Sequence, residues 1–168
     1  MNNIRSERLV MIKSKLEILS NRELDHISYI LSHFQESSLK PSEETPMHLF
    51  GRFLGIKQLD DGTTEMKLGL QNENTYGVAQ GGSIYTLADI AIGFTILKKL
   101  SEDQKVFTLE MKVNFIEKGQ GSRLIATPSI LRWGKNTVVS ECIIVGENGN
   151  LVAKALGTFY IVNAAERT

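Results

Sequence analysis

A single acidic residue, Asp89, lies within a long apolar segment of this sequence. The surrounding residues, "TLADIAIGFTIL" (86–97), are mostly leucine, isoleucine and alanine. An unpaired ionised carboxylate in an apolar environment costs on the order of several kcal/mol, even after the protein relaxes around it. Asp89 therefore lies on a solvated stripe of a helix, caps a neighbouring backbone group, or has a task such as deprotonating a water molecule or attacking a carbonyl carbon.

Two glycines, Gly81 and Gly82, precede this segment. The first backbone N–H groups of a helix have no partner inside the helix, and the helix dipole attracts negative charge to them. A carbonyl oxygen placed there would be polarised, and an oxyanion formed from it would be stabilised. The commoner role of a glycine pair is a tight turn packed against a sheet, and the pair alone does not decide between the two roles.

Other polar residues extend the candidate site. Asn74 lies upstream of the glycines, where its amide could orient water or a carbonyl group, although asparagine is also a common turn residue. Thr108 is predicted on the polar face of a strand beside Glu110, where threonine is usually only a strand former. Arg132 and Lys135 flank a predicted hairpin and could meet phosphate groups, or could simply be solvated.

The remaining reactive residue types give no further site. All three histidines (His26, His33 and His48) lie in the first third of the chain, and Cys142 is the single cysteine. This excludes an intrachain disulfide, provides no metal-ligand spacing, and leaves Cys142 as inert packing in an apolar strand. No Ser-His-Asp, P-loop or G-x-G-x-x-G pattern is present. We expect neither a metal nor another cofactor.

Composition and charge limit the classes of partner that we expect for this protein. The 168 residues include 19 basic and 19 acidic ones, so there is no electrostatic reason to expect a nucleic acid or an anionic membrane. The N-terminus mixes charges throughout, and the longest apolar run, "IAIGFTIL", is far too short to cross a bilayer. We therefore expect a cytoplasmic protein without a membrane anchor.

The first part of the chain is predicted to be helical. Apolar residues recur at helical spacing through residues 1–34, and Ser20 with Glu23 forms a capping box that would begin a second helix. Residues 35–46 are polar, contain two of the three prolines, and are predicted to form a linker. Residues 1–46 are thus interpreted as an N-terminal helical extension and linker.

Residues 47–168 are predicted to form a second, strand-rich domain. The strands "LFGRFLGIKQL" and "TTEMKLGL" flank the turn signal "DDG", and residues 83–100 form one long apolar helix. Four strand-like segments follow, and Asn148-Gly149 before the last of them suits a tight type I′ turn. Two strands, a long helix and a four-strand meander predict an α+β architecture, in which an antiparallel sheet wraps around the helix.

The pattern N-x-x-G-x-x-Q-G-G, followed by L-A-D on a long helix, resembles the hotdog-fold thioesterases. The resemblance is strongest to their PaaI-like branch, the phenylacetate-type acyl-CoA thioesterases, and runs from about Phe50 to Val162. It implies a homodimer, and by family habit a tetramer, in which two sheets pair edge to edge. Each active site would then lie at the dimer interface, so Asp89 would face a cleft completed by a second copy.

The resemblance also implies roles for matched positions. Asp89 would be the general base or nucleophile, and the Gly82 N–H group would polarise the thioester carbonyl while Gly81 shapes the turn. Asn74 would help to place the carbonyl or the water, and Thr108 would assist the water.

Two further features of the resemblance concern the substrate. Arg132 and Lys135 lie near positions that often contact coenzyme A phosphates. The family usually has a histidine directly before the glycine pair, and Gln80 stands there instead. Glutamine can still donate a hydrogen bond to a carbonyl, but it cannot change protonation state near neutral pH.

The predicted function is hydrolysis of an acyl-CoA, or of an acyl thioester on a carrier protein, to a free acid and a thiol. The alternative is a non-catalytic hotdog domain that binds acyl-CoA or a similar apolar ligand, and Gln80 favours this alternative. A dehydratase of the same fold ranks last, because such enzymes use a histidine in the cleft and none follows His48.

Overall fold

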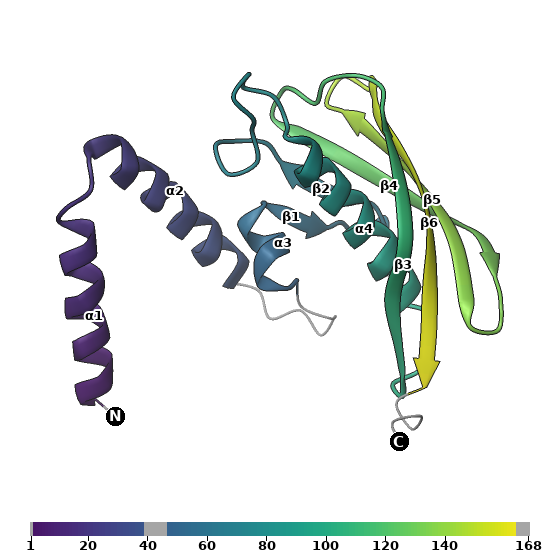
Figure 1. Ribbon diagram of the computed structural model, residues 1–168, viewed down its shortest axis with the longest axis horizontal. Helices are drawn as coiled ribbons and strands as arrows, with labels where there is room; N and C mark the ends of the chain where they lie inside the picture. The colour runs from purple at the N-terminus through teal and green to yellow at the C-terminus, as the bar shows by residue number, and fades with distance from the viewer. Residues whose placement is uncertain (1, 39–46, 164–168) are drawn as a thin grey trace. The chain divides into compact units, whose positions relative to one another are not determined.

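The protein is described by a computed structural model, which places the backbone of residues 2–38 and 47–163 (Figure 1). The chain divides into two compact units, residues 1–42 and 43–168. The first unit is helical, and the second contains all of the strands.

The first unit contains helices α1 (Asn2–Leu16) and α2 (Asn21–Ser38). The predicted capping box begins α2: the Ser20 N–H group donates to Glu23 Oε2 at 2.8 Å, and the Glu23 N–H group donates to Ser20 Oγ at 3.4 Å. Hydrogen bonds from Ser20 lower the pKa of the Glu23 carboxyl below its ordinary value. Of the predicted linker, residues 35–38 belong to α2, and residues 39–46 lie outside the described part of the chain.

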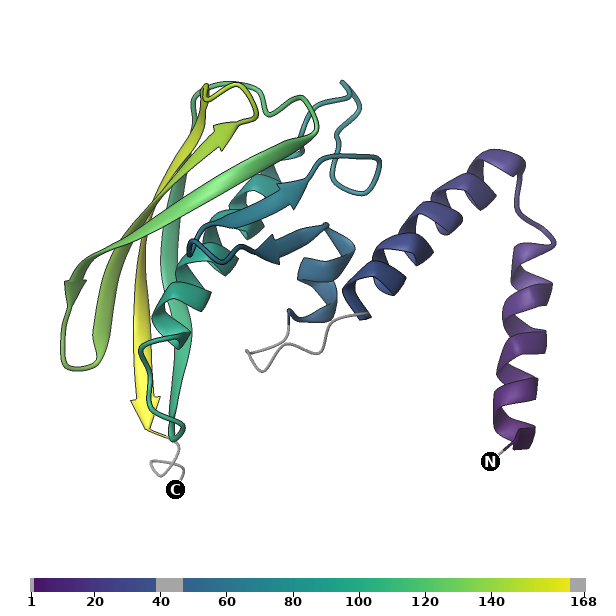
Figure 2. The same ribbon diagram turned by 180° about the vertical axis from the view of Figure 1, so that it is seen from behind.

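The second unit is one six-stranded antiparallel sheet curled around a long helix (Figures 1 and 2). Its strands lie in the spatial order β1-β2-β4-β5-β6-β3. The helices are α3 (Leu49–Phe53) and α4 (Gly81–Leu97), and the strands are β1 (Ile56–Gln58), β2 (Thr64–Lys67), β3 (Gln104–Phe115), β4 (Arg123–Trp133), β5 (Thr137–Gly146) and β6 (Leu151–Asn163). The predicted α+β fold, with its N-terminal helices, is confirmed.

Helix α4 is buried because it is apolar on nearly all sides. Leu87, Ile92 and Ile96 have no exposed surface and pack in one core with the inner face of the sheet. Strand β5 supplies alternate buried residues to this core, among them Cys142. Burial raises the pKa of the Cys142 thiol to about 12, which fits its prediction as unreactive packing.

The strand predicted for residues 49–55 is wrong. Leu49–Phe53 form the short helix α3, and His48 caps it by accepting a hydrogen bond from the Gly51 N–H group on Nδ1 at 3.1 Å. Only Ile56–Gln58 of that stretch pair with β2, in the predicted hairpin. The apolar residues at positions 49, 50, 53 and 54 follow helical rather than alternating spacing, which explains the difference.

The predicted four-strand meander is also wrong, because β3 does not pair with β4. Strands β4, β5 and β6 do form a meander, but β3 pairs with β6 at the far edge of the sheet, and β4 pairs with β2. Residues 116–122 therefore cross the end of the sheet to connect β3 with β4. This crossing loop lies against the start of α4, because the Ala79 N–H group donates to the Gly119 carbonyl at 2.8 Å.

The turn between β5 and β6 is not the predicted type I′ turn. Such a turn needs positive φ angles at both central residues, but Gly149 has a φ of 80° and Asn148 does not share this conformation. The Gly146 N–H group bonds the Asn150 carbonyl at 2.9 Å, which leaves three residues in the loop. A left-handed glycine at its third position is the usual three-residue alternative.

Within the described ranges, no helix is both long and apolar enough to cross a membrane. The same ranges contain no group of three or more His, Cys, Asp or Glu side chains that could hold a metal ion.

Candidate active site

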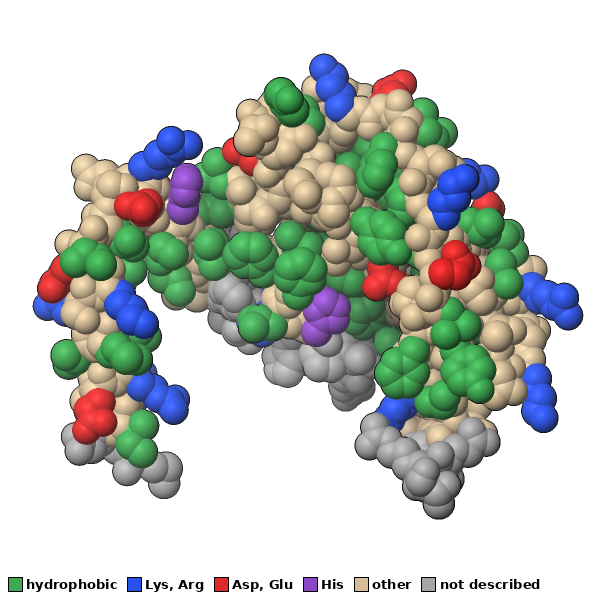
Figure 3. All heavy atoms as spheres, in the orientation of Figure 1, with side chains coloured by type: hydrophobic (Ala, Val, Ile, Leu, Met, Phe, Trp, Pro, Cys, Tyr) green, Lys and Arg blue, Asp and Glu red, His purple; other side chains and the backbone are tan. Residues whose placement is uncertain are grey.

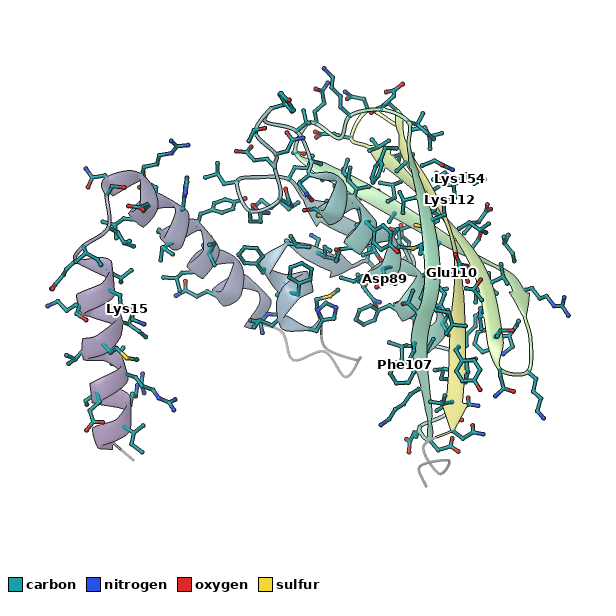
Figure 4. The ribbon with its side chains drawn as sticks, in the orientation of Figure 1. Lys15, Asp89, Phe107, Glu110, Lys112 and Lys154 are labelled. Carbon is teal, nitrogen blue, oxygen red and sulfur yellow. The ribbon has the colours of Figure 1, made fainter. Side chains whose placement is uncertain are left out.

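Asp89 lies on α4 beside the edge strand β3, where it is half-buried (Figure 4). The Thr108 hydroxyl donates a hydrogen bond to Asp89 Oδ1 at 2.7 Å. One helical turn earlier, the Tyr85 hydroxyl donates to the Met111 carbonyl of the same strand at 3.0 Å. Asp89 therefore belongs neither to the apolar core nor to a fully solvated stripe, but to the seam between α4 and β3.

A β-bulge places Thr108 next to Asp89. The pairing of β3 with β6 shifts register between Thr108 and Glu110, so Leu109 is the extra residue. The extra residue of a bulge moves the side chains that follow it to the opposite face of the sheet. Thr108 therefore faces the helix, whereas Glu110 points to the outer face and accepts a hydrogen bond from the Thr158 hydroxyl of β6 at 2.6 Å. The prediction that Thr108 shares a face with Glu110 is thus wrong.

The start of α4 is capped by Gln80. Its Oε1 atom accepts a hydrogen bond from the Ser83 N–H group at 3.0 Å. Because only the oxygen of the amide can accept, this bond assigns the oxygen to the cap and leaves Nε2 as a donor without a partner among the described residues. A Cβ atom at Gly82 would come within 2.8 Å of Gln80 Oε1, so the end of the Gln80 side chain would have to shift to accommodate a larger residue at position 82.

The backbone amides of Gly81 and Gly82 are available to a ligand. For neither N–H group is a hydrogen bond found within the described residues. They occupy the first two positions of α4, where helical N–H groups lack internal partners. The helix start therefore has two donors that could serve a carbonyl oxygen or an oxyanion.

Asn74 stabilises its own loop. Its Oδ1 atom accepts hydrogen bonds from the Tyr76 N–H group at 2.9 Å and from the Val78 N–H group at 3.4 Å. This is the turn role that competed with the catalytic one in the sequence. The amide nitrogen Nδ2 has no partner among the described residues, so Asn74 keeps a donor for a ligand.

Asn72, two residues earlier, was not selected by sequence reasoning, yet it is the most fully bonded side chain of this loop. It is only 2% exposed. Its Nδ2 atom donates to the carbonyls of Leu54 at 2.9 Å and Lys67 at 2.8 Å, and its Oδ1 atom accepts from the Gly69 N–H group at 3.1 Å. No local pattern distinguishes it from Asn74, because its partners are brought close only by the fold.

A pocket of about 310 Å³ opens beside the start of α4. Its walls come from the residues before and within the first turn of the helix and from the end of β3 with its crossing loop: Ala79, Gly81, Ile84, Phe115, Ile116, Glu117, Lys118 and Gly119. The ring of Phe115 lies directly over Gly81, where an added Cβ atom would be 3.4 Å from it. The pocket thus brings apolar side chains, with the charged Glu117 and Lys118, next to Gly81 at the helix start.

Within one chain, the two ends of this candidate site are separated. Gly82 and Asp89 are seven residues apart on α4, which corresponds to about 10 Å along a helix axis. A carbonyl group bound at Gly82 therefore lies beyond direct reach of the Asp89 of the same chain.

The fold does not bring Arg132 and Lys135 to this candidate site. Arg132 pairs with Val139 of β5. Val139 lies on the outer face of the sheet, opposite the buried residues of β5. The Arg132 side chain therefore points away from α4. Lys135 is exposed in the turn between β4 and β5.

Comparisons with known proteins agree with this architecture. The sequence profile of the thioesterase superfamily matches residues 76–153. The protein SSO2140 of Saccharolobus solfataricus, which is named as an esterase, is 30% identical to this chain over 115 residues. The aligned residues cover 66% of this chain and 81% of SSO2140. The medium/long-chain acyl-CoA thioesterase YigI of Escherichia coli is 26% identical over 97 residues, which cover 50% of this chain and 63% of that enzyme.

Among solved structures, the BH2602 protein of Bacillus halodurans, crystallised with CoA, matches with a TM-score of 0.77. The match covers 92% of this chain and 99% of that chain, and its 23% sequence identity supports the shared fold. The fold is the hotdog fold of the thioesterases. The chain belongs to the thioesterase superfamily, whose characteristic reaction is thioester hydrolysis.

Proposed function

We propose that this protein hydrolyses acyl-CoA thioesters to a free acid and a thiol. The observation that carries the proposal is the pairing of a half-buried carboxylate, Asp89, with the Thr108 hydroxyl at 2.7 Å, on the helix whose first amides are unpaired. Similarity to the acyl-CoA thioesterase YigI supports the choice of an acyl-CoA over other thioesters.

The residues divide the reaction into two tasks. Asp89 removes a proton from water, and the resulting hydroxide attacks the thioester carbonyl carbon. The Gly82 N–H group, with the outward donors of Gln80 and Asn74, holds the negative oxygen of the tetrahedral intermediate. The C–S bond then breaks, and Asp89 returns the proton to the departing thiolate. Gln80 therefore acts as a fixed donor and need not titrate.

A second copy of the chain would bring the two tasks together. Strand β3 forms one edge of the sheet, and it exposes Phe107 (54%), Leu109 (59%) and Phe115 (54%). Figure 3 shows hydrophobic side chains along this edge. A long apolar edge strand is a template for pairing with another strand. Pairing through β3 would bury this edge and set one chain's helix start opposite the Asp89 of its partner.

The pocket beside Gly81 offers room for part of the substrate. Ala79, Ile84, Phe115 and Ile116 provide an apolar lining, and Glu117 and Lys118 add one negative and one positive charge. A thioester whose oxygen is held by the helix start would have an apolar surface next to it. This combination suits an acyl thioester better than a small polar ester.

Thiol release from a panel of acyl-CoA thioesters, followed with a thiol reagent, tests the proposal. We expect turnover with at least one acyl-CoA and much slower turnover of the matching oxygen esters, because an alkoxide is a far poorer leaving group than a thiolate. Tight binding of acyl-CoA without thiol release would contradict hydrolysis and would support the ligand-binding alternative.

A mixing experiment tests the shared site. Asp89→Asn and Gly82→Ala chains are unfolded together and refolded at equal amounts. If each site uses Asp89 of one chain and Gly82 of the other, half of the dimers contain one intact site, and the mixture recovers about a quarter of wild-type activity. A mixture no more active than the average of its two parents would show that one chain supplies both groups.

A further inference from the structure

The loop that leads into α4 is a small closed hairpin. Its limbs are joined by a backbone hydrogen bond from the Gln80 N–H group to the Asn72 carbonyl at 2.8 Å and by another from Asn74 to Val78 at 2.8 Å. An isolated antiparallel bridge pairs Glu73 with Ala79 between them. The hairpin carries Asn74 near its tip and Gln80 at its end, so both polar residues move with it.

Asn72 attaches one limb of this hairpin to the rest of the unit. Its side chain bonds three backbone groups from separate places: Leu54 after α3, Lys67 at the end of β2, and Gly69 within the loop. Both Nδ2 protons are used, and Oδ1 accepts the third bond. The other limb is attached by the bond from Ala79 to Gly119.

We propose that Asn72 is a positioning residue, which holds the hairpin so that Gln80, Asn74 and the first amides of α4 point at the thioester. This proposal rests on the proposed function. Three hydrogen bonds fix the position of this side chain, because leaving the donors and acceptor of a buried amide unpaired is unfavourable. Through its own carbonyl, Asn72 then fixes the Gln80 backbone at the residue that caps α4.

The neighbouring Gln71 provides a matched control. It is an amide in the same loop and donates to the same Lys67 carbonyl, at 3.0 Å. Its Oε1 atom is buried without a partner, and neither its backbone nor its side chain has a hydrogen bond to the helix start. Gln71→Ala should therefore disturb the loop locally without moving Gln80.

The test compares Asn72→Ala and Gln71→Ala by amide hydrogen exchange and by kinetics. In Asn72→Ala, exchange at Gln80 and Ser83 should accelerate at least about tenfold, while Leu87 and Ile92 in the middle of α4 stay as in the wild type. The kcat for an acyl-CoA should fall at least about tenfold with KM within about threefold, since the loss is in alignment rather than affinity. Gln71→Ala should change both readouts by less than about twofold.

Unchanged exchange at Gln80 and Ser83 in a folded Asn72→Ala variant would overturn the proposal, as would an unchanged kcat beside faster exchange. Should Asn72→Ala not fold, Asn72→Ser is measured in the same way. The side-chain amide protons of Asn72 in the wild type then give a second reading. They should exchange at least about a hundredfold more slowly than those of Asn74, and equal rates would refute the anchor. Exchange needs no substrate, so an inactive wild-type chain would refute the proposed function and leave the anchor to be decided by exchange.

Discussion

The start and the middle of helix α4 carry the two halves of the proposed chemistry, and they are built differently. At the start, the working groups are backbone amides, and their positions depend on a hairpin anchored by Asn72 and on the cap from Gln80. In the middle, the working group is one side chain, Asp89, held by one hydroxyl. The first half should therefore respond to changes in backbone position, and the second to the identity of single atoms.

The largest effect is expected at the middle of the helix. Asp89→Asn preserves shape but removes the base, so kcat should fall at least about a hundredfold while the thermal midpoint stays within about 3 °C of wild type. Thiol release and thermal unfolding measure the two quantities. Asp103→Asn is the matched control, because Asp103 also accepts a hydroxyl hydrogen bond, from Ser101 at 2.6 Å, but is exposed in the turn between α4 and β3. Wild-type turnover of Asp89→Asn would end the assignment of the base.

A smaller effect is expected at the start of the helix. Gly82→Ala places a methyl group against Gln80 Oε1, which must move and release the Ser83 N–H group. The kcat should fall about twentyfold, less than the full loss of an oxyanion donor because the amide itself remains. Gly93→Ala lies on the same helix with no atom within 4 Å of the added Cβ, so it should keep activity and slightly stabilise the fold. Equal activities of the two variants would show that the Gln80 cap is irrelevant to catalysis.

The two halves also differ in how far the sequence predicted them. The apolar helix with its single carboxylate is a local pattern, and so is the glycine pair, which explains why both were found. The partner of Asp89 was placed on the wrong face because one extra residue, Leu109, reverses the alternation of β3. Nothing in "TLEMKVNF" indicates a bulge, since its cause is the pairing with β6.

The fold, too, could be predicted only where it depends on short local segments of the sequence. The number of strands and the capping box at Ser20 follow from short segments. The position of β3 beside β6, and the bond from the Asn72 side chain to the Leu54 carbonyl, are contacts between residues distant in sequence. Composition and spacing along the chain contain no information about tertiary partners, so they do not reveal that Asn72 is the buried and fully bonded asparagine of this loop.

Thr108→Val sharpens the comparison, because it removes one hydrogen bond to Asp89 and retains the strand shape. A hydrogen bond to a charged group is worth about 1.5 to 3 kcal/mol, part of which water replaces at this half-exposed seam, so kcat should fall about fivefold with little change in KM. Thr158→Val removes the equivalent bond to Glu110 on the outer face of the sheet. Its kcat should match wild type. A similar loss in both variants would mean that strand stability, and not the Asp89 contact, sets the rate.

The smallest effect is expected for Gln80→His, and the chain contains its own template for this change. His48 caps α3 through a bond from the Gly51 N–H group at 3.1 Å, just as Gln80 caps α4 through a bond from the Ser83 N–H group at 3.0 Å. A neutral histidine at position 80 can therefore keep the cap on Nδ1 and direct Nε2–H outward as the donor. At pH 8, kcat should lie within about threefold of wild type.

The pH dependence of this variant separates a fixed donor from a titrating group. Imidazole titrates near pH 6.5, and its protonated form has no acceptor for the Ser83 N–H group. The cap favours the neutral ring and so lowers the pKa of the histidine in the folded state. The stabilisation of the fold by the cap is therefore present above about pH 6.5 and is lost as the pH falls below that value. The thermal midpoint of Gln80→His relative to wild type should thus decrease between about pH 7 and pH 5. A constant difference across this range would show that position 80 does not cap the helix through its side chain, and the start of α4 would then be held by its backbone contacts alone.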